Sequence, residues 1–436
     1  MTLQILIILA VMIAAYALSK AFRLSVELSM FAAAVMGGIA GAFVAATPAA
    51  GDLARHLVEG ASTYLDVILV FFTATLFMTI VSESGGVSYA VRTALRVFGR
   101  KRLAALLVLM VIVLIPGALT GAGSVSLLVV GAPVALALGR LGVPRKKVAA
   151  ILFIVAGLSA AAPPVNIWAM ILCAGTAIPY VGFELTLGIP VLLLGSFTVL
   201  VLGWKKDPAA AADVPDVPEA PAGMNWWRVL TPFVVFFGLI AAYRLWPFRA
   251  PVLGLALPFV FAGAAALVVS PRKIAFLRLS RETVARLLPL LSTMVVVGML
   301  QQIMTVTGVR GLLSFAVIST PLVLLFLLLP VIIPFSEGVL TYGGAAIIGI
   351  PLIWYLDSLG FHATVVIAGL SLLWPLGDGL PPTALIGRLS NMVTGYTGSY
   401  RGFLASTWLP WLVVTAVGML MVLFSSRLAF LVRWSM

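Results

Sequence analysis

Two acidic residues stand within apolar stretches of the sequence, where they could carry or bind a coupling ion. Asp378 lies between two glycines, just before a Pro-Pro pair, and Glu337 follows Pro334 in a separate apolar stretch. An ionisable side chain at membrane depth is costly and marks a functional site by default. Glu337 and Asp378 are therefore candidate coupling-ion residues, for a proton or for Na+. The structural alternatives are a carboxylate at the outer water boundary for Glu337 and one that stabilises a broken helix for Asp378.

Breaks rich in glycine, proline and hydroxyl groups interrupt the first half of the sequence. The candidate groups there are Thr120, Gly121, Ser124 and Ser126 at one break, and Pro163, Pro164 and Asn166 at another. Such breaks expose half-helix ends, whose amides attract a carboxylate and whose carbonyls ligate a cation. We expect Thr120, Gly121 and Asn166 to hold the coupling ion, and the serines, the prolines and Asn166 to bind substrate. The alternatives are a kinked helix with hydroxyls bonded to the preceding turn, and a helix-capping role for Asn166.

The second half carries matching candidates for substrate binding. They are Gly338, Thr341, Pro381, Pro382, Thr383 and Arg388. The guanidinium of Arg388 could meet a substrate carboxylate. Its alternative is to extend along the helix to the cytoplasmic face of the membrane.

The composition places these breaks in a membrane. Of 436 residues, 62% are hydrophobic and only 9% are charged, against about 25% charged in soluble domains. About ten segments reach the length of about 20 mostly apolar residues that a spanning helix needs. We therefore expect an all-α membrane protein in the bacterial cytoplasmic (inner) membrane, with several spans in the lipid bilayer.

The formal net charge of +13 does not indicate a nucleic-acid partner. The basic residues form short clusters between apolar runs, as in Arg92–Arg102 and Arg140–Lys147, which is the positive-inside pattern. No basic face with stacking aromatics accompanies them. Cys173 is the only cysteine, which excludes an intrachain disulfide and a cysteine-based metal site. We expect no cofactor, apart from Na+ as a possible coupling ion.

Proline and glycine residues recur at a shift of 218, as from Pro116 to Pro334. The same shift relates Gly131 to Gly349, Pro133 to Pro351, Gly142 to Gly360, and Pro163-Pro164 to Pro381-Pro382. An ungapped register of this kind is typical of the internal repeats of secondary transporters. Between the two copies, Lys205–Gly223 is rich in proline and acid, and we expect a semi-extended linker in water that transport does not require.

Two inverted repeats and a linker follow from this register and the charge pattern. The first repeat, 1–204, is expected to contain three spans, a re-entrant hairpin at 103–139 that opens to the cytoplasm, a broken helix at 148–178 and a span at 183–203. The cytoplasmic linker covers 205–227. The second repeat, 228–436, is expected to contain three spans, an outward-opening hairpin at 311–358, a broken helix at 361–395 and a span at 403–424. The first apolar run, Leu3–Leu18, is expected to be a retained span with its N-terminus outside. We expect the hairpin tips and Pro-Pro loops to converge near the middle of the membrane.

Several of these segments resemble the large membrane subunit of TRAP transporters, the DctM-like family of the ion transporter superfamily. The resemblance rests on Gly121-Ala122-Gly123-Ser124, Arg140–Pro144, Pro163-Pro164, Leu359–His362 and Gly379–Thr383. It implies an elevator-type carrier, usually coupled to Na+, that moves carboxylates or sugar acids with a small membrane subunit and a periplasmic binding protein. Asn166 stands where that family has serine, and Glu337 and Asp378 add acids. These departures favour a stand-alone, proton-coupled relative, similar to DcuC, gluconate or citrate carriers.

The sequence therefore predicts a secondary transporter, or its membrane subunit, that couples a Na+ or H+ gradient to movement of a small anionic solute, with a homo-oligomer as a possible assembly. An integral-membrane enzyme on a lipid-linked substrate is the alternative from another class. Against it, His56 and His362 are the only histidines, and no clustered acid/base set is present. A channel, the third alternative, would not need inverted hairpins with central ligand sites.

Overall fold

A computed structural model describes residues 2–45, 47–212, 214–246, 249, 251 and 253–435. Helices dominate this part of the chain, which contains no strand. Nine of its helices are long and apolar enough to cross a membrane, or ten if one bent pair counts as a single span. The predicted fold class, an all-α membrane protein, is confirmed.

The first half of the chain contains a helical hairpin and a broken helix after its opening spans. The helices are α1 (Thr2–Ala21), α2 (Val26–Val44), α3 (Leu53–Ala61), α4 (Leu65–Glu83), α5 (Gly86–Phe98), α6 (Arg102–Thr120), α7 (Gly123–Ser126), the π-helical turn η2 (Leu127–Gly131), α8 (Ala132–Arg140), α9 (Arg145–Ala161), α10 (Ile167–Thr176) and α11 (Phe183–Gly203). The hairpin arms are α6 and η2–α8, and the broken helix is α9 with α10.

The second half contains the same kinds of element. They are α13 (Trp226–Leu245), α14 (Ala256–Val269), α15 (Phe276–Val306), α16 (Val309–Ser319), α17 (Leu322–Leu340), the π-helical turn η3 (Ala345–Gly349), α18 (Ile350–Ser358), α19 (Ala363–Gly377), α20 (Leu385–Thr394), α21 (Tyr400–Ser406), α22 (Trp408–Leu423) and α23 (Phe430–Ser435). The short helix α12 (Pro208–Ala212) lies between the halves.

Helix ends repeat at the shift seen in the sequence. Helix α8 runs from 132 to 140 and α18 from 350 to 358, and both ends differ by 218 (350 minus 132, 358 minus 140). The same shift relates η2 to η3 and α10 to α20 (385 minus 167). The shared prolines and glycines therefore mark the same breaks in both halves.

Three elements differ from the sequence expectation. The range 311–358 predicted for the second hairpin includes α16, which precedes the arms α17 and η3–α18. Helix α5 is a separate helix with exposed Arg96 on one side and buried Val91 on another. Its two-faced surface explains why an apolar-run criterion does not find it. The span predicted at 403–424 is two helices, α21 and α22, bent by 55°.

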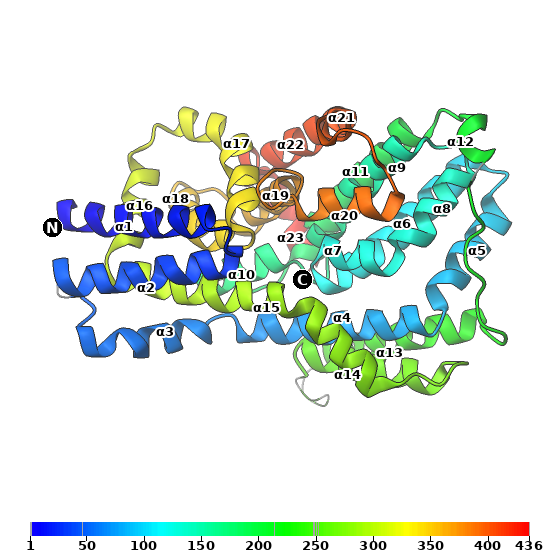
Figure 1. Cartoon of the computed structure of the whole chain (residues 1–436), viewed down its shortest axis with the longest axis horizontal. Coiled ribbons are helices and arrows are strands. Elements are labelled where there is room, and N and C mark those ends of the chain that lie inside the picture. Colours follow the sequence, from blue (N-terminus) through cyan, green and yellow to red (C-terminus); the bar gives the residue numbers. More distant parts are fainter. Residues whose placement is uncertain are drawn as a thin grey trace.

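The linker packs against the protein rather than extending freely in water. The Arg140 guanidinium of α8 pairs with Asp216 at 2.8 Å, and Arg92 of α5 pairs with Glu219 at 3.2 Å. Val217 between them is buried. In Figure 1 the chain runs from α12 along the edge of the molecule, past α5, to α13. The linker is thus extended over 214–221, as expected, but it lies against the protein, because Val217 is buried and its acids pair with arginines beside it.

The linker is still predicted to be cytoplasmic, and a single cysteine tests this. Ala209 is exposed, so Ala209→Cys in a Cys173→Ser background should react with a membrane-impermeant maleimide only after cells are permeabilised. The basic residues around the linker are the reason, because they favour the cytoplasmic side. Rapid labelling of intact cells would reverse the predicted orientation of every span.

The centre of the fold is formed by α9 and α19. All residues from Val148 to Ala161 and from Thr364 to Gly377 are buried. A Cβ at Gly157 of α9 would lie 3.1 Å from the Cβ of Pro375 in α19, so the two helices touch. Helices that are apolar on all sides belong inside a helical assembly. Each carries one Pro-Pro break at its end and so holds that break in the interior.

Candidate functional site

The first hairpin tip lies against the first Pro-Pro break. The Val165 amide, just after the break, donates to the carbonyl of Ala118 near the end of α6 at 3.0 Å. Gly121 at the tip has φ of +71°, and a Cβ there would lie 2.7 Å from Ile167. Both the backbone conformation and the close approach require glycine. This is the convergence of tip and break that the sequence predicts.

The hydroxyl groups of this tip are mostly bonded within the protein. Thr120 Oγ1 donates to the carbonyl of Pro116 at 2.8 Å, and Ser126 Oγ donates across the hairpin to the carbonyl of Val113 at 2.5 Å. Ser124 is buried in the first turn of α7. Thr120 is therefore bonded to the preceding helical turn, which is the structural alternative to ion binding. Ser126 joins the two hairpin arms. Ser124 is the hydroxyl at this tip that stays a candidate for binding substrate.

Asn166 serves as a helix cap in this structure. Its Oδ1 accepts from the Ala169 amide at 2.9 Å, and its Nδ2 donates to the carbonyl of Ala161 at 3.0 Å. The sequence did not identify Tyr180 as a site residue. Its hydroxyl accepts from the backbone amide of Asn166 and donates to the carbonyl of Pro164. The hydrogen bonds of Asn166 and Tyr180 connect the end of α9 to the start of α10 and hold the first break in place.

The second hairpin tip contacts the second Pro-Pro break in the corresponding way. The amide and the hydroxyl of Thr383 donate to the carbonyl of Gly338 at 3.2 and 2.9 Å. A Cβ at Gly377 would lie 2.0 Å from the carbonyl oxygen of Pro334. Tyr400, also missed from the sequence, donates to the carbonyl of Gly379 at 2.8 Å. This break is therefore held by backbone contacts, the Thr383 hydroxyl and one tyrosine.

The first arm of the second hairpin, α17, ends in an unusual backbone conformation. Thr341 has φ of +52° and ψ of −136°, a conformation that a β-branched residue rarely adopts. Next to it, Tyr16 of α1 donates to the carbonyl of Val339 at 2.6 Å. Strained residues of this kind cluster at functional sites. The tip is thus held in a strained form and is tied to a helix of the first repeat.

Two buried carboxyl groups lie where this tip meets the break. Glu337 and Asp378 are 1% and 7% exposed, and they are close enough to interact electrostatically. Trp168 Nε1–H of α10 donates to Glu337 Oε2 at 3.0 Å, whereas no described side chain donates to Asp378. Neither carboxyl has a basic partner among the described residues. Two adjacent acids in a desolvated place need protons or a cation to balance their charge.

No group of three or more His, Cys, Asp or Glu side chains is assembled in the described ranges.

The start of α20 offers unpaired donors beside the acid pair. Its N-cap residue, Ala384, supplies no side-chain bond, and the amides of Leu385 and Ile386 have no partner among the residues that the structure describes. Arg388, one turn further on, is exposed and donates to the carbonyl of Pro382 at 3.1 Å. A helix N-terminus and a guanidinium together favour a carboxylate. Pro381 and Pro382 are exposed beside them, whereas Pro163 and Pro164 are half-buried.

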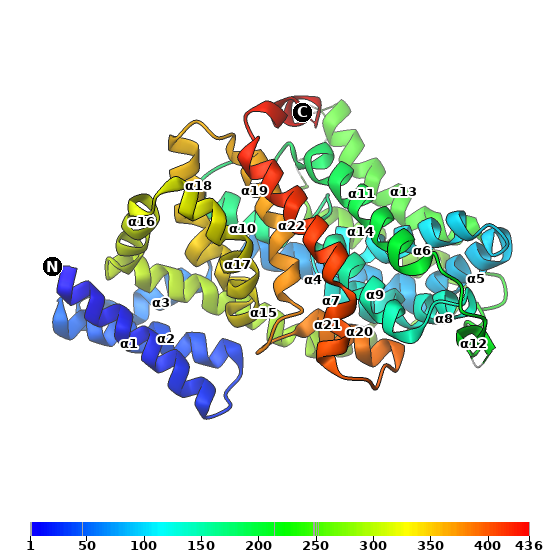
Figure 2. The ribbon, with the colours of Figure 1, turned by 90° about the horizontal axis from the view of Figure 1, so that it is seen from above.

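Each half contributes to the surroundings of the other half's break. A Cβ at Gly131 in η2 would lie 3.0 Å from Val393 of α20, and one at Gly349 in η3 would lie 2.5 Å from Leu172 of α10. The first hairpin tip approaches α20 as well, since a Cβ at Gly123 would lie 2.6 Å from Ile386. Figure 1 shows α7, α10, α19 and α20 in the middle of the molecule, and Figure 2 shows α7, α10 and α19 there as well. The four breaks therefore form one central cluster.

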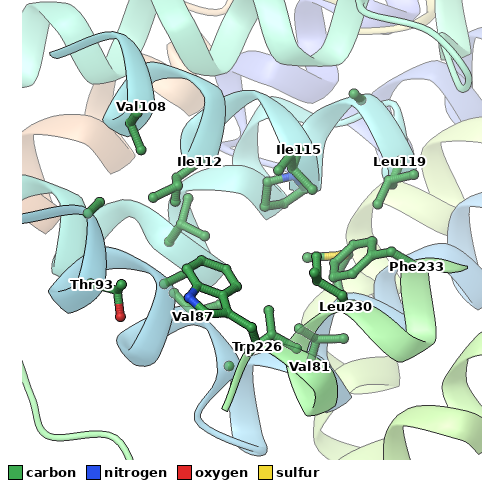
Figure 3. A pocket seen from close by; sticks show the side chains of 18 of the residues that line it. Val81, Val87, Thr93, Val108, Ile112, Ile115, Leu119, Trp226, Leu230 and Phe233 are labelled. Atoms are coloured by element: carbon green, nitrogen blue, oxygen red, sulfur yellow. The ribbon is translucent and has the colours of Figure 1, made fainter. Parts of the chain in front are cut away.

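Two apolar cavities flank the hairpins. The larger, of about 720 Å³, lies between α4, α5, α6 and α13, and the smaller, of about 510 Å³, between α1, α15, α16 and α17. Gly86, Phe98 and Val130 line the first, and the residues 218 positions later, Met304, Ala316 and Ile348, line the second. In Figure 3, the Thr93 hydroxyl and the Trp226 nitrogen are the polar atoms among the labelled side chains. Such a lining suits apolar chains and not an anion.

Comparison with solved structures finds the same fold in a known transporter. The chain is similar to the YdaH transporter of Alcanivorax borkumensis, with 15% sequence identity and a TM-score of 0.58, over 86% of this chain and 88% of the YdaH chain. The sequence matches no protein-family model. It also matches no curated protein. The chain is a multi-pass membrane protein with the fold of a solved transporter.

Proposed function

We propose that this chain is an ion-coupled carrier of a small organic anion, such as a carboxylate or a sugar acid. One observation carries the proposal: the buried pair Glu337 and Asp378 lies at the contact between a hairpin tip and a Pro-Pro break, with no basic partner in the described part of the chain. The unpaired start of α20 and Arg388 lie beside this pair, since the Gly387 amide donates to the Asp378 carbonyl at 3.1 Å. An ion site and an anion site therefore adjoin within one cluster.

The acid pair explains how ion and solute are coupled. With both carboxylates charged and desolvated, moving the site across the bilayer is costly. Protons or Na+ bound at Glu337 and Asp378 remove that charge, and the same neutralisation lets an anion bind at the start of α20 without repulsion. The hairpins and broken helices then cross as one body, in an elevator-type movement against the opening spans of each half. The solute moves only when the ion is bound, which makes the transport a symport.

The proposal includes a choice between two kinds of carrier. In a TRAP-type system, a binding protein and a small membrane subunit deliver the solute, whereas a stand-alone carrier needs neither. The acid pair favours the stand-alone, proton-coupled form, because it supplies the coupling site within this one chain. The resemblance of the hairpin tips to the DctM-like family favours the other form.

Flux measurements on the purified chain test the proposal. In proteoliposomes containing this chain alone, uptake of radiolabelled succinate and gluconate should rise when an inward H+ or Na+ gradient is imposed. Uptake driven by H+ without added proteins supports the stand-alone carrier, and uptake that requires a binding protein supports the TRAP-type form. Flux of either anion that ignores both gradients, or no flux of any organic anion across a panel, contradicts the proposal and favours the channel or enzyme alternatives.

A further inference from the structure

A second cationic group, outside the central cluster, has no counter-ion among the residues that the structure describes. Arg310 lies in the first turn of α16 and is half-buried. Its Nη2 donates to the carbonyl of Gly175, at the end of α10, at 3.3 Å, and its guanidinium lies 4.7 Å from the centre of the Trp354 ring of α18. Its Nε is buried and has no hydrogen-bond partner among the described residues. A buried donor without a partner is costly, so a ligand that accepts from it is favoured.

The side chains described around Arg310 are neutral. Tyr64 is the neighbouring titratable group, and its hydroxyl donates to Gln301 Oε1. This bond fixes the orientation of the Gln301 amide and leaves Nε2 as its free end. Nε2 would lie 3.7 Å from a Cβ at Gly175, the residue whose carbonyl Arg310 contacts. Arg310 and Gln301 therefore both bring donor groups close to Gly175 at the end of α10.

The equivalent arginine in the first half shows what is missing. A shift of 218 relates Arg310 to Arg92 (310 minus 92), and Arg92 of α5 pairs with Glu219 at 3.2 Å. Arg310 has no such carboxylate within the described residues. The same position thus has a carboxylate counter-ion in one half and, among the described residues, none in the other.

From this geometry we infer that Arg310 and Gln301, whose amide Tyr64 orients, form a second anion site, which receives the carboxylate of the solute at the seam between α16 and α10. A guanidinium held in place by an aromatic ring is suited to carboxylates, because its orientation is fixed before binding. The site joins α15 and α16 on one side to α10 and α18 on the other, so an anion bound there contacts both sides of the seam. The identity of the anion as the solute rests on the proposed function, whereas the existence of the anion site does not.

The electrostatic part of this inference can be tested without knowing the solute. Ala177 is exposed, two residues after Gly175, and Ala177→Cys in a Cys173→Ser background provides a local thiol. We would compare its reaction rates with the anionic sulfonatoethyl and the cationic trimethylammonioethyl methanethiosulfonate reagents. An uncompensated Arg310 should favour the anionic reagent, and Arg310→Gln should lower the anionic-to-cationic rate ratio roughly tenfold. Arg92→Gln is the matched control and should leave the ratio unchanged.

Protection and charge-retaining variants complete the test. Succinate should slow the anionic reagent in the parent protein and have no such effect in Arg310→Gln. Arg310→Lys keeps the charge and should keep most of the ratio, which separates loss of charge from loss of folding. An unchanged ratio in Arg310→Gln, or equal protection by succinate in both proteins, overturns the inference. Absence of flux in proteoliposomes together with a ratio that depends on Arg310 contradicts the proposed function and leaves the anion site standing.

Discussion

Asp378→Asn is expected to abolish ion-driven uptake while the protein still inserts and folds. Asparagine has nearly the shape of aspartate, so the packing at the end of α19 is retained, but it can neither release a proton nor hold a cation by charge. The loss should be large, at least about a hundredfold, because a buried charge is among the strongest electrostatic determinants at membrane depth. The measurement is initial uptake in proteoliposomes under an imposed gradient, with the amount of folded protein checked by size-exclusion chromatography.

The ion can be identified from the same variant. If Asp378 carries the proton, uptake by the parent protein should fall as external pH rises, and Asp378→Asn should lose this dependence. If Asp378 ligates Na+, the variant should show a weaker response to Na+ at every pH. Asp357→Asn, an exposed acid at the end of α18, is the control and should behave as the parent. Parental rates with unchanged ion dependence in Asp378→Asn would return the residue to a structural role.

The asymmetry between the halves is the reason to expect so specific an effect. The residue equivalent to Asp378 is Ala160 (378 minus 218), which is fully buried in α9. The first break is closed by neutral groups, the amide of Asn166 and the hydroxyl of Tyr180. A broken helix can therefore be stabilised in this protein without a carboxylate. An acid that only one half needs is better explained by coupling than by stability.

Much of the fold is predictable from the positions of proline and glycine. Proline and glycine interrupt helices for local, steric reasons, so their register over 218 residues gives the breaks, and the breaks give the hairpins and broken helices. Helices α8 and α18 show this, since their ends correspond at both termini. The amphipathic α5 is harder to find, because an apolar-run criterion ignores a helix with a polar face. Helix α16 is short and apolar, so the sequence does not separate it from the hairpin arm that follows it.

The site is less predictable because its contacts are long-range. The sequence gives no sign that Trp168 of one half donates to Glu337 of the other. It also does not show that the oxygen and the nitrogen of the Asn166 side chain both bond to backbone groups. Residue type shows which side chains can bind a ligand, but only the fold shows which of them are already occupied. Thr120, Ser126 and Asn166 already bond to backbone groups, so the stronger candidates for ligand binding are the acid pair and the start of α20.

Gly377→Ala is expected to have the second large effect, because it separates the acid pair. A Cβ at Gly377 would lie 2.0 Å from the carbonyl oxygen of Pro334 and 2.6 Å from the Cβ of Glu337. Backbone cannot move aside as a flexible side chain can, so α17 and α19 must separate. Overpacking of this kind costs roughly 1–3 kcal/mol, and the shift displaces Glu337 from Asp378. Gradient-driven uptake should fall to background, and the thermal unfolding midpoint in detergent should drop.

The appropriate control is Gly238→Ala in α13, where an added Cβ meets nothing within 4 Å. Alanine is favoured over glycine inside a helix by about 0.5–1 kcal/mol, so this variant should transport normally with unchanged or higher stability. Parental uptake by Gly377→Ala would contradict the close contact of the second hairpin with its break. The first half contains a matching contact. Gly117 of α6 faces Ser159 of α9, and a Cβ at Gly117 would lie 1.8 Å from the Ser159 hydroxyl oxygen. Ser159 is the residue 218 positions before Gly377. Each hairpin thus approaches its broken helix where one partner has no side chain, and small residues allow such approach between membrane helices. Glycine at 377 is therefore what lets the two carboxyl groups share one site.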